Sequence, residues 1–289
     1  MNRTSAGLAW GLFLALAAGC QLVPSFHSQK SDKVDPEALA PPSKFSARVP
    51  PFAFMSDVEI STNQPMFKEL SQLREKVFKE LQLPSSNAVV QVFLFEDKDR
   101  YQRFMQSKYP DLPKRRAFFV AQPHRLGGGE DLLVYTFWGD KTQQDLRHEL
   151  THSLLHSVLK SVPLWLDEGL AEYFEMPPGW NGVNYQHLLQ LRQSLESGQK
   201  TDLARLEGLT EVNQMNHAEY RESWAWVHFM LHNPETRPVL RKYLQELRTN
   251  VRPSPLQPRL AAVVPSLDSA LERHLAGLDL NKEQGASNR

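Results

Sequence analysis

The spacing of hydrophobic residues changes along the chain and predicts a first half that contains a sheet. Alternating, β-branched and aromatic runs predict strands at residues 57–61, 88–95, 117–121 and 131–138. Hydrophobic residues three and four positions apart predict helices over residues 65–83 and 97–107. The glycine-rich residues 125–130 are typical of a hairpin turn between the last two strands. Together these segments predict a small mixed or antiparallel sheet with helices packed on it.

After residue 138 the pattern is helical throughout. A central helix follows Asp140, and a second helix covers residues 163–175. Helical spacing then continues over five further segments, at residues 183–197, 201–208, 218–232, 235–249 and 265–277. We therefore expect an α+β fold. Its predicted parts are an α+β subdomain at residues 55–180, a helical subdomain closing a cleft at 181–280, and a disordered tail at 281–289.

The N-terminus has the pattern of an export signal. Arg3 precedes an apolar run at residues 6–18, which is too short to cross a membrane as a stop-transfer helix. Residues 21–54 contain six prolines with serines and lysines between them, and such a segment buries too little apolar surface to fold. We predict that residues 1–20 are a signal peptide and residues 21–54 a disordered tether.

The end of the signal indicates how the protein is retained. Residues 16–20 read L-A-A-G-C and resemble the bacterial lipobox, in which signal peptidase cuts before a lipid-modified cysteine. The resemblance implies that Cys20 carries a lipid anchor in the cell envelope, with Gln21 favouring the outer membrane. In the alternative, cleavage follows Ala17, Cys20 has no role, and the exported protein is periplasmic or extracellular.

The amino-acid composition limits the kinds of binding site and metal site that the chain can form. Lys+Arg and Asp+Glu both total 33, so the formal net charge is zero, which gives no footprint for binding nucleic acid. Cys20 is the single cysteine of the 289 residues, so neither an intramolecular disulfide nor a cysteine-based metal cluster can form. Any metal ligands must be histidine and carboxylate side chains.

The central helix carries a run with metal-binding spacing. Residues 148–152 read H-E-L-T-H. On a helix, positions i and i+4 lie on one face, so His148 and His152 can bind one metal ion. The side chain of Glu149 projects near the same open coordination position. Two histidines on a surface helix would give the same letters by chance, and the downstream sequence decides between the two interpretations.

A catalytic zinc ion usually has three protein ligands. His156 continues the four-residue spacing, but eight residues of helix rise about 12 Å, which is too far for ligands of one ion. We therefore expect His156 to be a core residue or a hydrogen-bond partner of the site. The third ligand must come from an element that folds back on the central helix, and Glu168 in the second helix is well placed.

The second helix carries a family resemblance. Residues 165–173 read W-L-D-E-G-L-A-E-Y, and gluzincin metallopeptidases of the aminopeptidase branch have W-L-x-E-G-x-A-x-Y after H-E-x-x-H. The resemblance implies that His148, His152 and Glu168 bind one Zn²⁺ and that Glu149 is the general base. The fifteen residues from Ser153 to Asp167 are fewer than in that branch. The chain is thus most similar to the broader clan, in particular to peptidase-MA-like bacterial proteins.

Further site residues follow from positions relative to these ligands. Glu172 lies one turn after Glu168 and is predicted to hold a ligand imidazole, or else to face solvent. Tyr220 is our first choice for the donor that stabilises the oxyanion and His217 the second, against ordinary core packing. The strand at residues 131–138 is predicted to pair with an extended peptide substrate, unless its apolar residues belong to the core.

These features predict an exported, lipid-anchored zinc metallopeptidase that cleaves protein or peptide in the cell envelope. Glu149 takes a proton from water activated by the metal and returns it to the leaving amine. One alternative is a non-catalytic envelope lipoprotein that keeps zinc for stability or binding. Another is an amide hydrolase that acts on cell-wall peptides. Endopeptidase and exopeptidase action, the natural substrate and the oligomeric state stay open.

Overall fold

The computed structural model describes residues 39–123 and 129–279. The predicted signal peptide with Cys20, and the predicted tail at 281–289, lie outside these ranges. So do residues 124–128, most of the predicted glycine-rich turn. No helix in the described ranges has the length and apolar character needed to cross a membrane.

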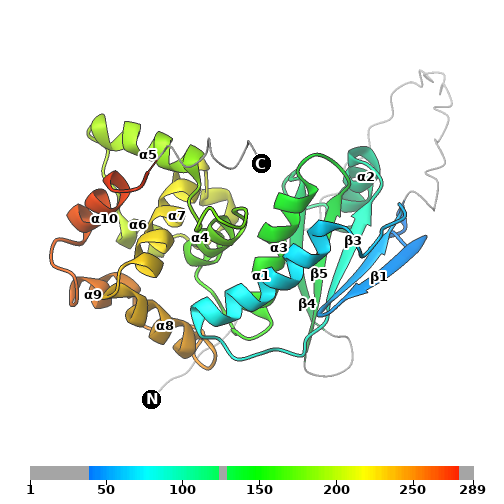
Figure 1. The fold of residues 1–289 in the computed structure, drawn as a ribbon, viewed down its shortest axis with the longest axis horizontal. Coiled ribbons are helices and arrows are strands. Elements are labelled where there is room, and N and C mark those ends of the chain that lie inside the picture. The colour runs from blue at the N-terminus through cyan, green and yellow to red at the C-terminus, as the bar shows by residue number, and fades with distance from the viewer. Residues whose placement is uncertain (1–38, 124–128, 280–289) are drawn as a thin grey trace, which may run out of the picture. The chain divides into compact units, whose positions relative to one another are not determined.

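The sheet has five strands in the order β1-β2-β3-β5-β4 (Figure 1). The parallel centre is formed by β2, β3 and β5, while β1 and β4 run antiparallel to their neighbours at the two edges. The strand bounds are Phe45–Val49 for β1, Phe52–Ser56 for β2, Val90–Phe95 for β3, Ala117–Pro123 for β4 and Glu130–Phe137 for β5. The antiparallel pairing of β4 with β5 confirms the predicted hairpin.

The first two strands correct the predicted tether. Residues 45–56 fold into β1 and β2 because Phe52 and Phe54 supply two fully buried side chains to the core. The prolines at positions 50 and 51 lie in the turn between these strands, where few ladder hydrogen bonds are needed. The part of residues 21–54 that the structure describes is therefore not a disordered linker along its whole length.

The strand predicted at residues 57–61 is also wrong. The hydroxyl of Ser56 accepts a hydrogen bond from the backbone of Val58, which turns the chain out of the ladder. The side chain of Asp57 is buried in an ion pair with Arg100, so the alternation of apolar residues here does not mark a sheet face. The sheet strand next to this segment is β2.

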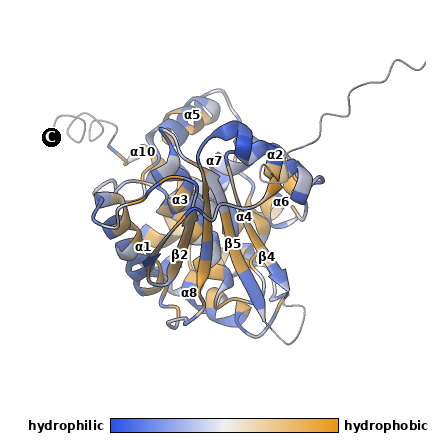
Figure 2. Ribbon diagram, turned by 90° about the vertical axis from the view of Figure 1, so that its right-hand side faces the viewer, coloured by the Kyte–Doolittle hydropathy of each residue, from blue (hydrophilic) through white to orange (hydrophobic). Residues whose placement is uncertain are grey.

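Alternate residues of the strands contribute to two clusters on opposite faces of the sheet. On one face, Val92 and Val134 join the main core with α1 (Pro65–Leu81) and α3 (Thr142–His156). On the other face, Phe95 and Tyr135 pack with α2 (Lys98–Lys108). Figure 2 shows the hydrophobic strands between more hydrophilic helices. The sheet thus holds α3 in place along its length.

The second half is helical, as predicted. Its helices are α4 (Leu164–Phe174), α5 (Tyr185–Glu196), α6 (Leu203–Glu207), α7 (His217–His232), α8 (Thr236–Leu247), α9 (Leu256–Ala261) and α10 (Leu267–Ala276). We did not predict α9, because Pro255 precedes it and Pro258 lies within it, and prolines disfavour helices. Both prolines stand at its start, where a missing N–H costs little.

One hydrophobic core continues from the sheet into the helical half. Helix α4 lies against α7, and a Cβ at Gly169 would be 2.6 Å from the backbone oxygen of Ser223. The described residues belong to one compact unit, so the predicted subdomains 55–180 and 181–280 share a core. This close contact fixes Glu168, next to Gly169, relative to α7.

Candidate metal centre

The candidate site forms where α3 and α4 meet. His148 and His152 lie one turn apart on α3, and Glu168 comes from α4. Helix α4 is anchored by the buried side chains of Trp165 and Leu166 just before Glu168. The structure therefore brings together the three residues that we predicted as metal ligands.

The potential ligand atoms converge closely. The Nε2 atoms of His148 and His152 are 3.2 Å apart. Oε2 of Glu168 lies 3.4 Å from Nε2 of His148 and 3.6 Å from Nε2 of His152. All three atoms lie within 4.8 Å of one another, so this group could hold a metal ion.

The donor set fits a small divalent ion. Two imidazoles bound to one tetrahedral zinc ion at about 2.1 Å place their nitrogens about 3.4 Å apart, close to the separation seen here. Oε2 of Glu168 is buried and accepts no hydrogen bond within the described part of the chain. A metal cation in this position would give this buried oxygen a direct partner.

Two carboxylates hold the outer sides of the imidazoles. Nδ1 of His148 lies 2.8 Å from Oε2 of Glu175, and Nδ1 of His152 lies 3.0 Å from Oδ1 of Asp167. Each contact turns the Nε2 atom of that ring towards the centre. Asp167 also contacts Nε2 of His156 at 2.9 Å, so His156 supports the site from outside, as predicted.

The role predicted for Glu172 is filled by Glu175. Glu172 instead contacts His187 at 3.0 Å and accepts a hydrogen bond from Asn184 at 3.4 Å. Although Glu172 also lies within 4.8 Å of His148 and Glu175, the imidazole Nδ1 is bonded to Glu175. Glu175 follows Glu168 by seven residues, or two helical turns, so both lie on the same side of the helix. We did not predict a site residue at this spacing.

Without a metal the site is a cluster of coupled charges. Burial lowers the pKa of His152, but Asp167 and Glu168 outweigh burial and raise that pKa to about 10. Burial also lowers the pKa of His148, and Glu168 and Glu175 raise it well above its usual value. Burial raises the pKa of Glu168, yet its contacts with both imidazoles hold that pKa well below normal.

Glu149 lines a cavity of about 480 Å³ next to His148. Burial raises the pKa of its carboxyl group, while the two imidazoles and a backbone hydrogen bond from Phe119 act in the opposite direction. The structure therefore places a carboxyl group with a raised pKa beside the three candidate ligands, in a space open to a substrate.

Tyr220 and His217 line the same cavity, at the start of α7. The hydroxyl of Tyr220 donates a hydrogen bond to Oε1 of Glu168 at 3.3 Å. It also accepts one from Arg115 at 2.6 Å. We did not predict Arg115, which precedes a strand and matches no motif. The structure brings together the residues that we proposed for the oxyanion, and their role stays a prediction.

The strand beside the site is β4. We predicted that residues 131–138 form the edge that pairs with substrate, but β5 is enclosed between β3 and β4. The edge strand next to β5 is β4, and its Phe119 ring lies 6.4 Å from the ring of His152 and 5.2 Å from that of His156. The apolar residues of β5 belong to the core, which was the alternative interpretation.

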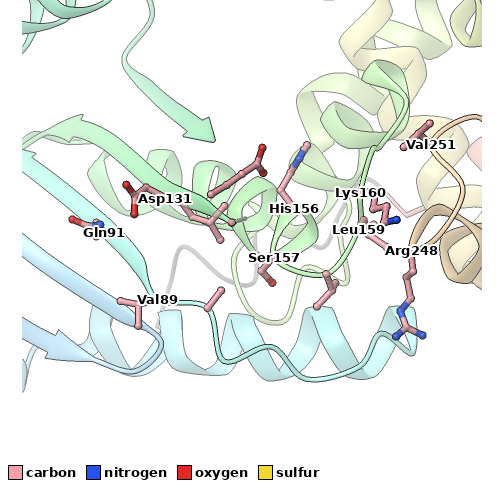
Figure 3. Close-up of a pocket in the computed structure, with 14 residues that line it drawn as sticks. Val89, Gln91, Asp131, His156, Ser157, Leu159, Lys160, Arg248 and Val251 are labelled. Carbon is pink, nitrogen blue, oxygen red and sulfur yellow. The ribbon is translucent and has the colours of Figure 1, made fainter. Parts of the chain in front are cut away.

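A larger cavity of about 930 Å³ lies at the C-terminal end of α3 (Figure 3). His156 and Lys160 line it from the end of α3 and the following loop, and Val89 and Asp131 line it from the sheet side. None of the three candidate ligands contributes to its lining. Of the three candidate ligands, His148 lines the smaller cavity of about 480 Å³.

Comparison with known families gives a match to part of the chain. Residues 144–254 are similar to a family described as "Protein of unknown function (DUF1570)". The match covers less than half of the chain, and it includes the candidate ligands, Glu149 and Tyr220. Arg115 and β4 lie outside it. No curated protein matches the chain.

Proposed function

We propose that the protein is a zinc-dependent metallopeptidase that hydrolyses peptide bonds with Glu149 as the general base. The observation that carries the proposal is the convergence of three ligand atoms, one of them from His148, which lines an open cavity together with Glu149. Two imidazoles and one carboxylate are the ligand set of many catalytic zinc ions. The H-E-x-x-H and W-L-x-E-G-x-A-x-Y runs, which resemble those of gluzincins, support the same proposal.

The residues around the metal have separate tasks. Zinc, when bound, would polarise the substrate carbonyl and lower the pKa of a water molecule to about 7. Glu149 would accept the proton of that water at its carboxylate and return it to the departing amine nitrogen. Asp167 and Glu175 hold the two imidazoles in orientation through their Nδ1 atoms.

The substrate that fits best is an extended peptide. β4 is an edge strand, and its outer side can pair with a further strand by main-chain hydrogen bonds. Its residue Phe119 lies near His152, so a peptide paired with β4 would pass close to the candidate ligands. We further propose that the protein acts in the cell envelope through an anchor at Cys20, as the N-terminal sequence indicates.

Catalysis explains the site better than a structural role does. Structural zinc sites are usually closed by four protein ligands, whereas the candidate group in the described residues has three, and His148 and Glu149 line a cavity. A structural site would also have no use for Glu149. A non-catalytic protein stabilised by zinc is therefore the weaker proposal.

The decisive test compares wild type with Glu149→Gln. We expect each to bind about one zinc ion, and only the wild type to cleave denatured casein in a reaction stopped by a chelator. Equal cleavage by both would refute the mechanism. Zinc binding with no cleavage of casein, peptide libraries or peptidoglycan would favour the non-catalytic alternative. Cleavage of purified peptidoglycan but not of casein would favour the amide hydrolase.

A further inference from the structure

Arg115 contacts the candidate metal centre from a separate part of the chain. Arg115 precedes β4. It contacts the carboxylate of Glu168 on α4 and the phenol of Tyr220 on α7. Its Nη2 atom is 2.6 Å from the hydroxyl oxygen of Tyr220, and its Nη1 atom is 3.7 Å from Oε1 of Glu168. A loop beside the sheet is thus connected to the candidate ligand of the helical half.

The contact with Arg115 decides where the proton of Tyr220 points. A guanidinium group can only donate hydrogen bonds, so the phenol oxygen must act as acceptor towards Arg115. The phenol has one proton of its own, and this proton is then free to point elsewhere. The geometry directs it to Oε1 of Glu168 at 3.3 Å. Without Arg115, the phenol could rotate its proton to other acceptors or to water.

The two oxygens of Glu168 are consequently distinguished. Oε1 is held by Tyr220 and lies near the positive charge of Arg115. Oε2 faces the imidazoles at 3.4 and 3.6 Å and accepts no hydrogen bond within the described ranges. A carboxylate fixed in this way presents one oxygen to a metal ion and does not need to reorient when the ion binds.

We propose that Arg115 is a positioning residue that acts through Tyr220 to fix the Glu168 carboxylate for metal binding. This inference rests on the proposed zinc site and adds a determinant of its affinity. An ordinary ion pair is the competing explanation, since the Arg115 side chain is 33% exposed. Exposed ion pairs contribute little, and removing one would leave zinc affinity unchanged.

The test is the zinc dissociation constant, measured by competition with a chelator of known affinity. The chains to compare are the wild type, Arg115→Gln, Arg115→Lys, Tyr220→Phe and the double variant with Arg115→Gln and Tyr220→Phe. The matched control is Lys141→Gln. It removes a positive charge from the same cavity, and within the described residues the Lys141 side chain has no hydrogen bond or ion pair.

We expect Arg115→Gln and Tyr220→Phe each to weaken zinc binding by roughly tenfold or more. The double variant should bind about as weakly as Tyr220→Phe alone, because Arg115 acts through the phenol. Arg115→Lys keeps a cationic donor and should recover part of the affinity. Lys141→Gln should bind zinc like the wild type. Thermal unfolding of the metal-free forms reports any general loss of structure.

Three results would overturn the inference. The first is a wild-type zinc affinity in Arg115→Gln. The second is a loss of affinity in the double variant that equals the product of the two single losses. The third is a loss in Lys141→Gln as large as that in Arg115→Gln. In each of these cases the wild type still binds zinc, so the proposed metal site stands and the proposed function is not contradicted. Failure of the wild type to bind zinc would instead overturn the proposed metal site together with this inference.

Discussion

The carboxylates on the outer side of each imidazole contribute to the protonation state of the metal-free site. In that state His148 and His152 are held protonated by Glu168, Asp167 and Glu175, whose carboxylates outweigh the effect of burial on both pKa values. A histidine must be neutral to bind zinc, so the imidazole protons have to leave when the ion enters.

Zinc binding near neutral pH should therefore release between one and about two protons per ion. The pKa of His152 is about 10 in the metal-free protein, well above the working pH, and zinc affinity should fall as the pH is lowered. Calorimetry in buffers of different ionisation enthalpy measures the number of protons. Asp167→Asn removes the main cause of the raised pKa of His152 and should reduce the release. Binding without proton release would contradict the charges assigned to the site.

The sequence predicts some of these residues better than others, and the reason is distance along the chain. His148 and His152 are on one helix, so their contact follows from helical geometry alone. Glu168 required a motif on a second helix. Arg115 reaches Tyr220 over 105 residues, and no local pattern indicates such a contact. Glu175 is near in sequence, but it was overlooked because Glu172 also lies on the helix beside the ligand.

At the scale of elements, the contact between α4 and α7 depends on the missing side chain of Gly169. A Cβ there would lie 2.6 Å from the backbone oxygen of Ser223 and 2.9 Å from the Val227 side chain. Gly169→Ala should thus destabilise the fold by about 1–3 kcal/mol, although alanine is the better helix former. The midpoint of thermal unfolding measures this effect.

Gly277→Ala is the matched control, since a Cβ at the end of α10 would meet its nearest atom at 3.5 Å. It should leave the unfolding midpoint almost unchanged. If Gly169→Ala were equally well tolerated, the two helices would not be in the close contact that places Glu168 beside Tyr220.

Helices α7 and α10 enclose a second group of histidines, away from the metal site. His228 and His232 stack with ring centroids 4.2 Å apart, and Nδ1 of His228 lies 2.8 Å from Nε2 of His274. Burial and the neighbouring imidazoles lower the pKa of His228 to about 2 and that of His274 to about 4. The folded protein therefore keeps these rings neutral.

This group should make the fold sensitive to acid. The unfolded chain takes up protons on these histidines below about pH 6.5, whereas the folded chain does not, so the free energy of unfolding falls as the pH falls through that value. His228 alone should account for a loss of about 2–3 kcal/mol at about pH 4.5. Denaturant unfolding at several pH values measures the slope.

The slope between about pH 7.5 and 5.5 should be smaller in His228→Asn than in the wild type. His217→Asn replaces an exposed histidine at the other end of α7 and should leave the slope unchanged. An equal slope in the wild type and in His228→Asn would show that other groups cause the acid sensitivity.

The identity of the edge strand could not be predicted from the sequence. The alternation of residues 131–138 indicates a strand, but strand order depends on pairings between distant segments. Strands β3 and β5 pair in parallel although β4 lies between them in the sequence. This crossover encloses β5 and leaves β4 at the edge beside the candidate site.

For the whole molecule, the N-terminal strands belong to the folded unit. Phe52 and Phe54 are 0% and 1% exposed, and β2 pairs with the central strand β3 along its whole length. A chain that starts at residue 39 should fold and bind zinc. A chain that starts at residue 57 should lose cooperative unfolding, because it lacks β1, β2 and their part of the core. Circular dichroism on heating distinguishes the two outcomes.

At residues 45–54 the tether prediction failed for a related reason. Prolines and serines lower the average hydropathy of residues 21–54, and this average conceals two short strands with only a few large apolar residues. Short edge segments fold because a neighbouring strand supplies their hydrogen-bond partners. A window of composition carries no information about that neighbour.

The candidate metal ligands come from two helices with different attachments. Helix α3 packs on the sheet, whereas α4 packs on α7 in the helical half. An ion held by His148, His152 and Glu168 would therefore act as a cross-link between the two halves of one core. When a chelator removes the ion, the exchange of amide hydrogens with solvent should accelerate more in α3 and α4 than in β3.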